Sequence, residues 1–450
     1  MPTDCNGRAI HFTPLGRRQV LADFDGGLIT SDAGALLLRE AAGRLNLFDR
    51  MAQAIPDPRE LSMIEHEQRT MLAQRVLGIA CGWEDLNDHQ SLRNDPLFRV
   101  ASGRGIDPER PLAGASTLCR LENRIDRRSC VELSKLLVEL FVESHTTAPT
   151  ELVLDFDATD DEVHGKQVGR FFHGYYDHYC FLPLYVFCGD QLLVAYLRPS
   201  NIDAAKHSRA ILKLLVARLR QAWPAVKITV RGDSGFCRWK MLRWCDRHDV
   251  DYVVGIAKNP ALLRLAGPLM GAAKEQFEQT KQKQRIFGEF AYAAGTWDKP
   301  RRTIAKAGHG ERGENPRFVV VGPGVGGEPQ ALYDELYCAR GEMENRIKEQ
   351  QLGLFADRTS RHDFVANQFR VLLSAFAYAL VEHVRRTALA GTELARAQVP
   401  TIRTKLLKVG AVVRTSVRRV VLHLSASYPL ADLFRQVAAT LLGPLPRPSS

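Results

Sequence analysis

The residues Glu151-Leu-Val-Leu-Asp155-Phe-Asp157-Ala-Thr159-Asp160-Asp161 place an apolar run directly ahead of four carboxylates. The run predicts a buried strand. Side chains alternate between the faces of a strand, so we expect Asp155 and Asp157 on the same face. Adjacent carboxylates repel each other, and neither is stable when buried without a partner. A divalent cation such as Mg²⁺ suits these oxygen ligands. A solvated strand-to-loop turn, where Asp is common, is the alternative.

The composition is that of an ordinary globular protein with a surplus of positive charge. The chain has 450 residues, is 45% hydrophobic and 25% charged, and carries a formal net charge of +10. The length allows several domains. The charge favours a polyanionic partner, most simply nucleic acid, with a role in solubility as the alternative. Nine cysteines without a Cys-x-x-Cys pair predict reduced thiols. No signal pattern and no long apolar run occurs, so we expect a cytoplasmic protein without a membrane span.

Residues 1–145 are predicted to form a helical N-terminal domain that binds DNA. After an irregular lead-in over residues 1–25, Thr30-Ser31-Asp32 is expected to cap a helix over residues 33–45. The segment 116–124 alternates apolar and basic residues, with arginines at 120 and 124 on one helical face. This pattern is typical of a recognition helix, and equally of an amphipathic helix with a solvated basic side.

Strands are expected from residue 150, and residues 146–261 are predicted to form the first part of a catalytic core. The expected order is three strands, a helix, a strand, a helix and a strand (152–157, 179–188, 191–198, 204–222, 227–231, 237–248 and 251–257). A three-strand meander followed by crossover helices predicts a mixed α/β sheet flanked by helices. Asp157 ends the first strand and Asp233 the fourth. If these strands are parallel neighbours, both carboxylates meet at one sheet edge; alone, Asp233 is typical of a turn or helix cap.

Residues 262–335 interrupt this rhythm and are predicted to form a β-rich insertion. Short strand candidates cover residues 285–292, 301–306 and 317–321. Trp297 lies in a predicted turn among basic residues, where an aromatic ring can stack on an unpaired base. A tryptophan that anchors the turn on the insertion's own core is the alternative.

The third carboxylate is predicted on a helix, in a second part of the core over residues 336–390. Steps of three and four residues place one set of polar side chains on a single helical face: Tyr337, Arg340, Glu344, Lys348 and Gln351. Such a face can point into a site, where it offers a carboxylate to a metal and cations to a phosphate. A solvated face with Glu344–Lys348 pairing is the alternative. Residues 391–450 are predicted to be a basic helical region, with eight Lys or Arg and a single acid after residue 400.

Three motifs together resemble the DDE transposases of bacterial insertion sequences: Asp157-Ala-Thr159, Arg231-Gly-Asp233-Ser-Gly-Phe236 and Tyr337-x2-Arg340-x3-Glu344. They are similar to the branch with a Tyr-Arg-Glu-Lys signature and to the insertion-sequence group numbered thirteen-eighty. The resemblance implies an RNase H-like fold and a site for two Mg²⁺ ions, for which Mn²⁺ can substitute. Carried onto this chain, it makes Asp157, Asp233 and Glu344 the catalytic metal ligands, with Asp155 or Asp160 in support.

The resemblance also implies roles for the neighbouring residues. Tyr337 and Arg340 would hold a phosphate, and Trp297 would stabilise a distorted base. The signature Lys falls at Gln351, so Lys348 is the candidate replacement. The implied activity is cleavage at the inverted repeats of an insertion sequence and strand transfer into double-stranded target DNA. A homodimer on DNA, in the cytoplasm of a bacterium at the nucleoid, is expected. A nuclease that cuts without joining and a silent DNA-binding repressor are the alternatives.

Overall fold

The computed structural model describes residues 9–105 and 110–444, and the chain divides into two compact units. The first unit contains the chain up to Phe48, Pro58–Cys119 and His383–Gly443. The second contains Asp49–Asp57 and Arg120–Glu382. The first and last segments of the chain therefore belong to one unit, which corrects the prediction of separate domains over residues 1–145 and 391–450.

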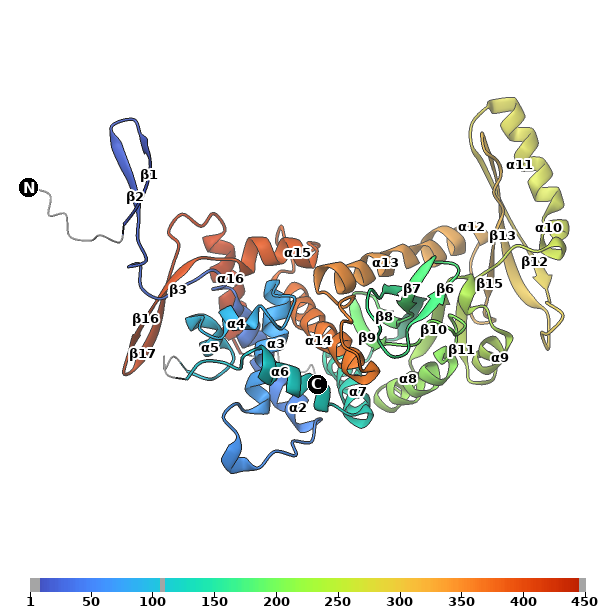
Figure 1. The fold of residues 1–450 in the computed structure, drawn as a ribbon. Helices are drawn as coiled ribbons and strands as arrows, with labels where there is room; N and C mark the ends of the chain where they lie inside the picture. The colour runs from blue at the N-terminus through green and yellow to red at the C-terminus, as the bar shows by residue number, and fades with distance from the viewer. Residues whose placement is uncertain (1–8, 106–109, 445–450) are drawn as a thin grey trace, which may run out of the picture. The chain divides into compact units, whose positions relative to one another are not determined.

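Short helices form most of the first unit (Figure 1). They are α1 (Ala35–Arg44), α3 (Gln68–Cys81), α4 (His89–Leu92), α5 (Pro96–Ala101), α15 (Val399–Ile402) and α16 (Ala431–Leu442). Helix α3 is buried along almost its whole length and is the core of this unit. Helix α5 begins as its sequence demands, because the Asp95 carboxylate accepts hydrogen bonds from the Leu97 and Phe98 backbone nitrogens and Pro96 needs no donor.

Strands occur near both ends of the chain, where the sequence predicted an irregular segment at the start and helices at the end. The expected irregular lead-in contains a hairpin of β1 (Ile10–Leu15) and β2 (Arg18–Ala22). The expected helical C-terminal region contains β16 (Ala411–Ser416) and β17 (Arg419–Leu424), which form a sheet with β3 (Ile29–Thr30). Paired valines in β16 and β17 favour a strand, because β-branched side chains pack well on a pleated surface. Thr30 therefore lies in a strand, and the residue that caps α1 is Gly34.

A nine-stranded mixed sheet is the centre of the second unit, counted over the described residues. Its order is β12-β13-β15-β11-β10-β4-β8-β9, with β14 paired to β13. The strands are β4 (Glu151–Ala158), β8 (Leu184–Cys188), β9 (Gln191–Tyr196), β10 (Lys227–Gly232), β11 (Val250–Ile256), β12 (Gln284–Tyr292), β13 (Arg301–Gly310), β14 (Gly313–Glu314) and β15 (Arg317–Val321). Strands β4, β10 and β11 are mutually parallel, and the other pairs are antiparallel. The predicted mixed sheet flanked by helices is confirmed.

The predicted strand over residues 179–188 is divided in two. Strand β7 (His178–Phe181) forms a small sheet with β5 (Asp161–Glu162) and β6 (Phe171–His173), whereas β8 belongs to the central sheet. Pro183 lies at the break, since it has no N–H to donate to a ladder. The predicted two-residue turn, Gly189-Asp190, joins β8 to β9, with Gly189 at a φ of +57°.

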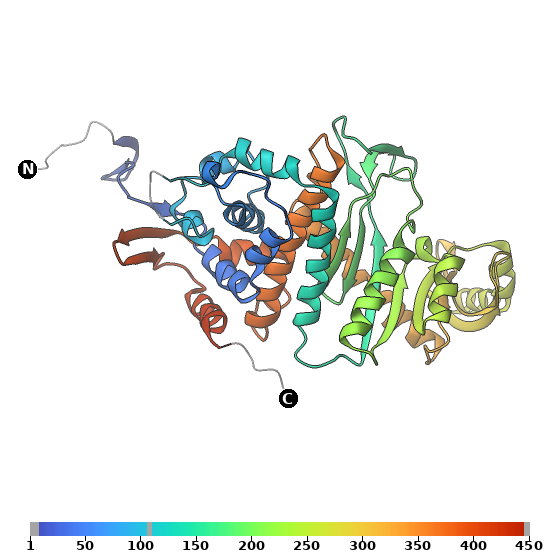
Figure 2. The same cartoon turned by 90° about the horizontal axis from the view of Figure 1, so that it is seen from below.

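Helices cover both faces of the sheet. One face packs against α7 (Arg127–Glu143), α8 (Ser208–Ala222) and α9 (Trp239–Arg247), seen in front of the strands in Figure 2. Leu152, Leu154 and Phe156 of β4 point into that core. The other face packs against α14 (Phe364–Ala388), where the ring centroids of Phe187 and Tyr378 are 5.8 Å apart. The alternation of β4 therefore directs its aspartates toward this second face.

Helix α14 is long and apolar enough to cross a membrane, but 83% of its most apolar stretch is buried inside the protein. No other helix of the described residues meets that test. The apolar stripe of this helix is buried in the core and includes Phe369, Leu372, Leu373, Phe376 and Leu380.

The segment predicted as a β-rich insertion over residues 262–335 differs in two ways. It contains the helix α11 (Gly267–Thr280), preceded by α10 (Pro260–Leu265). Its strands also continue the central sheet, because β15 pairs antiparallel with β11 from Val253↔Val321 to Ile256↔Phe318. Without β15, strand β11 would expose unpaired backbone groups at a sheet edge. The segment is therefore an extension of the central sheet.

Candidate functional site

Asp157 and Asp233 lie opposite each other at the carboxyl ends of adjacent parallel strands. In the pairing of β4 with β10, Asp155 is opposite Arg231 and Phe156 is opposite Gly232, an offset of 231 − 155 = 76 residues. The two site aspartates are separated by the same number, 233 − 157 = 76. The paired register ends at Phe156 and Gly232, and Asp157 and Asp233 are the residues that follow in the two chains. The condition set by the sequence, that these strands be parallel neighbours, is met.

The backbone around Asp233 is fixed by short-range contacts. Asp233 caps the turn η2 (Ser234–Phe236), and its carboxylate accepts a hydrogen bond of 2.9 Å from the Gly235 nitrogen. Gly255 of β11 lies beside this turn, since a Cβ there would be 3.1 Å from the Ser234 nitrogen. The same Cβ would be only 2.6 Å from the Tyr337 hydroxyl. Gly255 therefore allows the second acid and Tyr337 to approach one strand.

The sequence reasoning did not single out Gly255. A glycine inside an apolar strand is a signal for close backbone approach, so the position was available from the pattern 250–256. What the pattern does not reveal is which group approaches. That information comes from Tyr337, which lies 82 residues further along the chain (337 − 255).

Glu344 lies on a helical run that begins before the predicted start at Gly341. The run consists of α12 (Pro329–Ala331), the π turn η3 (Leu332–Tyr337), the 3₁₀ turn η4 (Cys338–Arg340), α13 (Gly341–Lys348) and the π turn η5 (Glu349–Gly353). Pro329 suits the first turn, where no backbone donor is needed. Met343 and Ile347 are buried, and Glu344 is exposed, so the apolar and polar sides of α13 are as predicted.

Arg340 contacts both the first and the third acid. Its Nη1 lies 3.2 Å from Asp157 Oδ2, and its Nη2 lies 2.8 Å from Glu344 Oε1. The side chains of Arg340 and Asp157 are only 19% and 16% exposed, whereas that of Glu344 is 48% exposed. The Arg340 guanidinium therefore links Asp157 on a strand to Glu344 on a helix, although the two acids are 344 − 157 = 187 positions apart in the sequence.

The electrostatics of this cluster are those of crowded, partly buried acids. Burial raises the pKa of Asp157 to about 7; Arg340 opposes the rise, and the charges of Asp233 and Glu344 add to it. Burial also raises the pKa of the Tyr337 hydroxyl, with Arg340 opposing and Asp233 adding. Burial acts to lower the pKa of Arg340, but Asp157 and Glu344 outweigh it, so this pKa lies above its ordinary value.

The residues present fit a divalent cation in part. Asp157 and Asp233 offer oxygen ligands at one edge, and the raised pKa of Asp157 shows that its charge lacks full compensation. In the described ranges, however, no three His, Cys, Asp or Glu side chains gather closely enough to hold a metal. Glu344 forms an ion pair with Arg340, so its carboxylate is not positioned with Asp157 and Asp233 as a third metal ligand.

Asp155 has a partner of its own and is a support for the site. Its carboxylate accepts two hydrogen bonds from Arg231, from Nε at 2.5 Å and from Nη2 at 2.7 Å. Arg231 also donates from Nη1 to the Leu336 carbonyl at 2.6 Å. This buried group therefore joins β4, β10 and the helical run that carries Glu344. Asp160 lies 2.9 Å from His178 Nε2.

The remaining predicted site residues lie apart from this cluster. Gln351, at the signature Lys position, donates a hydrogen bond of 2.8 Å to the Asp160 carbonyl and so holds the loop after β4. Lys348 is exposed on α13. Trp297 is partly buried, with its ring 5.5 Å from that of Tyr292 and 5.2 Å from the Arg301 guanidinium. These contacts are those of the turn-anchoring alternative, and base stacking by Trp297 stays a prediction.

The predicted recognition helix is present as α6 (Ala115–Arg124). Arg124 Nη1 lies 3.5 Å from Asp57 Oδ1, and the Arg124 side chain is mostly buried. Arg120 is exposed. DNA reading by this helix stays a prediction.

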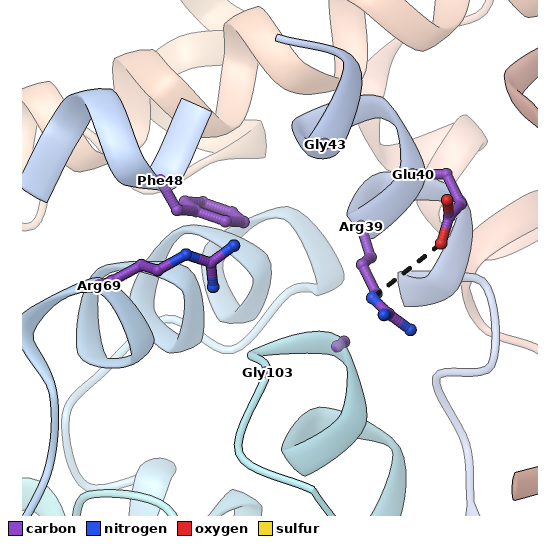
Figure 3. Close-up of a pocket in the computed structure, with 7 residues that line it drawn as sticks. Arg39, Glu40, Gly43, Phe48, Arg69 and Gly103 are labelled. Carbon is purple, nitrogen blue, oxygen red and sulfur yellow. Dashed lines mark ion pairs between the residues drawn. The ribbon is translucent and has the colours of Figure 1, made fainter. Parts of the chain in front are cut away.

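A separate pocket lies in the first unit, with a volume of about 240 Å³ (Figure 3). Arg39 and Glu40 of α1 face it with Arg69 of α3, and Arg39 Nε lies 4.0 Å from Glu40 Oε1. None of the predicted site residues lines it. The candidate site is therefore the sheet edge in the second unit.

Acids on two neighbouring strand ends and on a helix are the arrangement expected of a DDE motif. The profile of the family described as Transposase DDE domain group 1 matches residues 12–443, and the chain belongs to this family of DDE transposases. A comparison with curated proteins gives no match. A solved structure of piggyBac transposase, a synaptic complex with hairpin DNA, is similar at a TM-score of 0.44 and 8% identity, covering 84% of this chain and 80% of that one.

Proposed function

We propose that this chain cuts DNA at the ends of a bacterial insertion sequence and joins the freed 3′ end to target DNA. Family membership supplies the transposase activity. The observation that carries the finer proposal is the register of β4 and β10, which sets Asp157 against Asp233, with Arg340 linking Asp157 to Glu344. The proposed metal ligands are these three acids.

The strand order supports an RNase H-like core. Numbered along the chain, β4, β8 and β9 form an antiparallel meander, and β10 and β11 add in parallel on the other side of β4. The first and fourth strands are therefore neighbours, which an acid pair at two strand ends requires. In this proposal, β12 to β15 are an elaboration beyond the five-stranded core.

Divalent metal ions are general among DDE transposases, and the proposal assigns two Mg²⁺ ions, with Mn²⁺ as a substitute. Bound there, the ions would neutralise the phosphate, activate the attacking oxygen and stabilise the leaving 3′ oxygen. Asp157 must lose its proton to act as a ligand. Because its pKa is about 7, protons compete with the metal ions for this carboxylate near neutral pH.

Arg340 and Tyr337 are the proposed phosphate ligands. Arg340 presents two N–H donors in a fixed fork, the geometry that suits a phosphate as well as the carboxylates it contacts here. The Tyr337 hydroxyl stays protonated, because its pKa is raised, and it can donate one hydrogen bond. Both groups come from the helical run that carries Glu344, so the acid and the phosphate donors are positioned together.

The partners in this proposal are the inverted repeats of an element of group thirteen-eighty and a double-stranded target. A homodimer would hold two ends together. The net charge of +10 supports a DNA partner. A location in the bacterial cytoplasm, at the nucleoid, is part of the same proposal.

The test is cleavage of a labelled duplex carrying an element end, in Mg²⁺, with an added target plasmid. Wild type is compared with Asp233→Asn and Glu344→Gln. The matched control is Glu342→Gln, which neutralises an exposed acid two residues from Glu344 on the same helix. We expect metal-dependent cuts and joined products from wild type and control, and neither from the two site variants.

The other outcomes separate the alternatives. Cuts that depend on Asp233 without joined products would identify a nuclease and overturn strand transfer. Binding without cutting, equal in all four proteins, would identify a DNA-binding repressor. Cutting that survives both site substitutions would remove these acids from the reaction.

A further inference from the structure

Among the described residues, the strands β16 and β17 form a two-stranded ribbon that pairs with β3 at its base. Strand β16 pairs with β3 through Ala411↔Thr30 and Val412↔Ile29, and the Val413 nitrogen donates to the Leu28 carbonyl at 2.7 Å. Ala411 and Val413 are buried. From Arg414 to Val421, every side chain is exposed. Figure 1 shows the two strands running on past β3.

The exposed part of the ribbon has one basic face and one apolar face. Cross-strand pairing sets Val412 opposite His423, Arg414 opposite Val421, and Ser416 opposite Arg419. In this register Arg414, Ser416, Arg419 and His423 share a face with Val412 and Val421, and Thr415, Val420, Leu422 and Leu424 lie on the other face. No acidic residue occurs between Glu393 and Asp432. Among the described residues, no carboxylate forms an ion pair with an arginine of this ribbon. The face therefore carries uncompensated positive charge.

The tip of the ribbon presents an apolar side chain to solvent. Val417 and Arg418 make the two-residue turn, and Val417 is fully exposed. Arginine follows at both 418 and 419. An exposed valine side chain is unfavourable in water and is stabilised by entering an apolar environment. The arginines beside it favour an environment that is bordered by anions. The steps between stacked bases, bordered by phosphates, are such an environment.

The dimensions of the ribbon suit a DNA groove. The part beyond the anchored Val413 spans three residues per strand, roughly 10 Å at the rise of a strand. The major groove admits a two-stranded ribbon and is about 8.5 Å deep, and proteins that enter the minor groove insert apolar wedges there. A second copy of this ribbon is a poor partner, because its arginines would repel.

We propose that the β16–β17 ribbon is an arm that binds duplex DNA, with its basic face on the phosphates and Val417 inserted into a groove. The proposal rests on the proposed function only in taking duplex DNA as the partner. It deepens that function by assigning part of DNA recognition to a ribbon in the first unit, remote in sequence from the three acids. The region over residues 391–450, predicted to be basic and helical, thus carries part of its positive charge on two strands.

The test measures binding of the full chain to a labelled duplex, in EDTA, over a series of salt concentrations. The variant Arg414→Ala/Arg419→Ala removes two charges from the basic face. We expect the slope of log K against log[salt] to fall by about 2, and affinity at low salt to fall about tenfold or more. The matched control is Arg312→Ala, an exposed arginine at the turn of another hairpin, β13–β14, where Glu311 and Glu314 flank it. It should bind as wild type does.

A second variant tests the wedge. Val417→Ser keeps all charges, so the salt slope should not change, but the bend induced in a duplex with dyes at both ends should decrease. Arg414→Lys/Arg419→Lys should retain the slope, which separates lost charge from lost folding. An unchanged slope and affinity in the double alanine variant would overturn the proposal. So would loss of self-association in sedimentation with DNA affinity intact, which would identify a second copy as the partner. Because EDTA excludes catalysis, failure of the proposed cleavage would leave this result standing.

Discussion

Asp155 and Arg231 form a buried ion pair that joins β4 to β10 two residues before the strands reach Asp157 and Asp233. Asp155 and Asp157 share a face of β4, yet only Asp157 contacts the group that also holds Glu344. Two aspartates of one motif therefore have different tasks. Asp155 fixes the strands, and Asp157 faces the site.

The variant Asp155→Asn should be strongly destabilised. It leaves the Arg231 guanidinium buried without its carboxylate, a change that typically costs about 3–5 kcal/mol. Chemical denaturation measures the loss. Asp157→Asn is the control, because it removes a charge that Asp233 and Glu344 repel, and its metal-free unfolding midpoint should be no lower than that of wild type. Equal destabilisation by both substitutions would contradict the division of tasks.

The metal-free protein should lose stability as pH rises from 4 to 7. The folded state holds a proton on Asp157 up to a pKa of about 7, whereas the unfolded state loses it near the ordinary value of 3.8. Fewer protons bind the unfolded state in this window, so the free energy of unfolding falls with pH, by about 4 kcal/mol in total from this group. Thermal unfolding between pH 4 and pH 8 measures the slope.

Two comparisons make this pH dependence specific. Asp157→Asn should remove its share of the slope. Added Mg²⁺ should stabilise more at pH 7.5 than at pH 5.5, since the cation requires the ionised carboxylate. A wild-type slope that persists in Asp157→Asn would assign the effect to other groups.

Gly255→Ala should reduce cleavage with little loss of folding in the first unit. The added methyl would meet the Tyr337 hydroxyl at 2.6 Å and the Ser234 nitrogen at 3.1 Å, so the turn that carries Asp233 or the Tyr337 ring must move. A misplacement of about 1 Å can cost about 100-fold in rate. The double variant Gly255→Ala/Tyr337→Phe relieves the closest contact. It should recover part of the rate if the ring is the obstacle, and none if the Asp233 turn has moved.

Arg340→Gln should separate metal binding from DNA cleavage. Removing the guanidinium takes a positive charge from between Asp157 and Glu344, so Mn²⁺ should bind the DNA-free protein more tightly, as titration followed by electron spin resonance would show. Cleavage should still fall, because the phosphate loses a bidentate donor. Arg340→Lys retains the charge and should leave Mn²⁺ affinity near that of wild type. Weaker Mn²⁺ binding by Arg340→Gln would show that Arg340 positions the acids.

Lys348→Ala should weaken binding to an element end, with a salt slope lower by about 1, if this exposed lysine replaces the signature residue. Gln351→Ala should leave the slope unchanged. It removes a hydrogen bond to the Asp160 carbonyl and should cost about 1 kcal/mol of stability. Weaker binding by Gln351→Ala, with binding by Lys348→Ala unchanged, would instead assign the phosphate contact to position 351.

The sequence allowed the central strands and the acid pair to be predicted because both depend on local patterns. Apolar runs with polar ends mark β4, β10 and β11, and the positions of Asp157 and Asp233 follow from where two of those runs end. The contacts that hold the site are different. Arg231 reaches the Leu336 carbonyl across 105 positions, and Arg340 reaches Asp157 across 183, and no local pattern encodes such partners.

The errors have a similar origin. The ribbon of β16 and β17 was assigned to a helical region because its basic composition outweighed the evidence of its paired valines. The strands β12, β13 and β15 were predicted from their strand periodicity, but only the pairing of β15 with β11 shows which sheet they join. Grouping the ends of the chain into one unit likewise depends on contacts between segments more than 300 residues apart.

The three acids emerge from the ribosome in the order in which they occur along the chain. Asp157 and Asp233 emerge while 344 − 233 = 111 residues are still to be added before Glu344, an interval of roughly 6–20 s at ordinary elongation rates. The first unit is completed later still, because it needs His383–Gly443. A nascent or prematurely terminated chain therefore has two acids on a sheet edge and no third, and it lacks the ribbon. In the proposed function such a chain lacks one metal ligand, so it should not cut DNA.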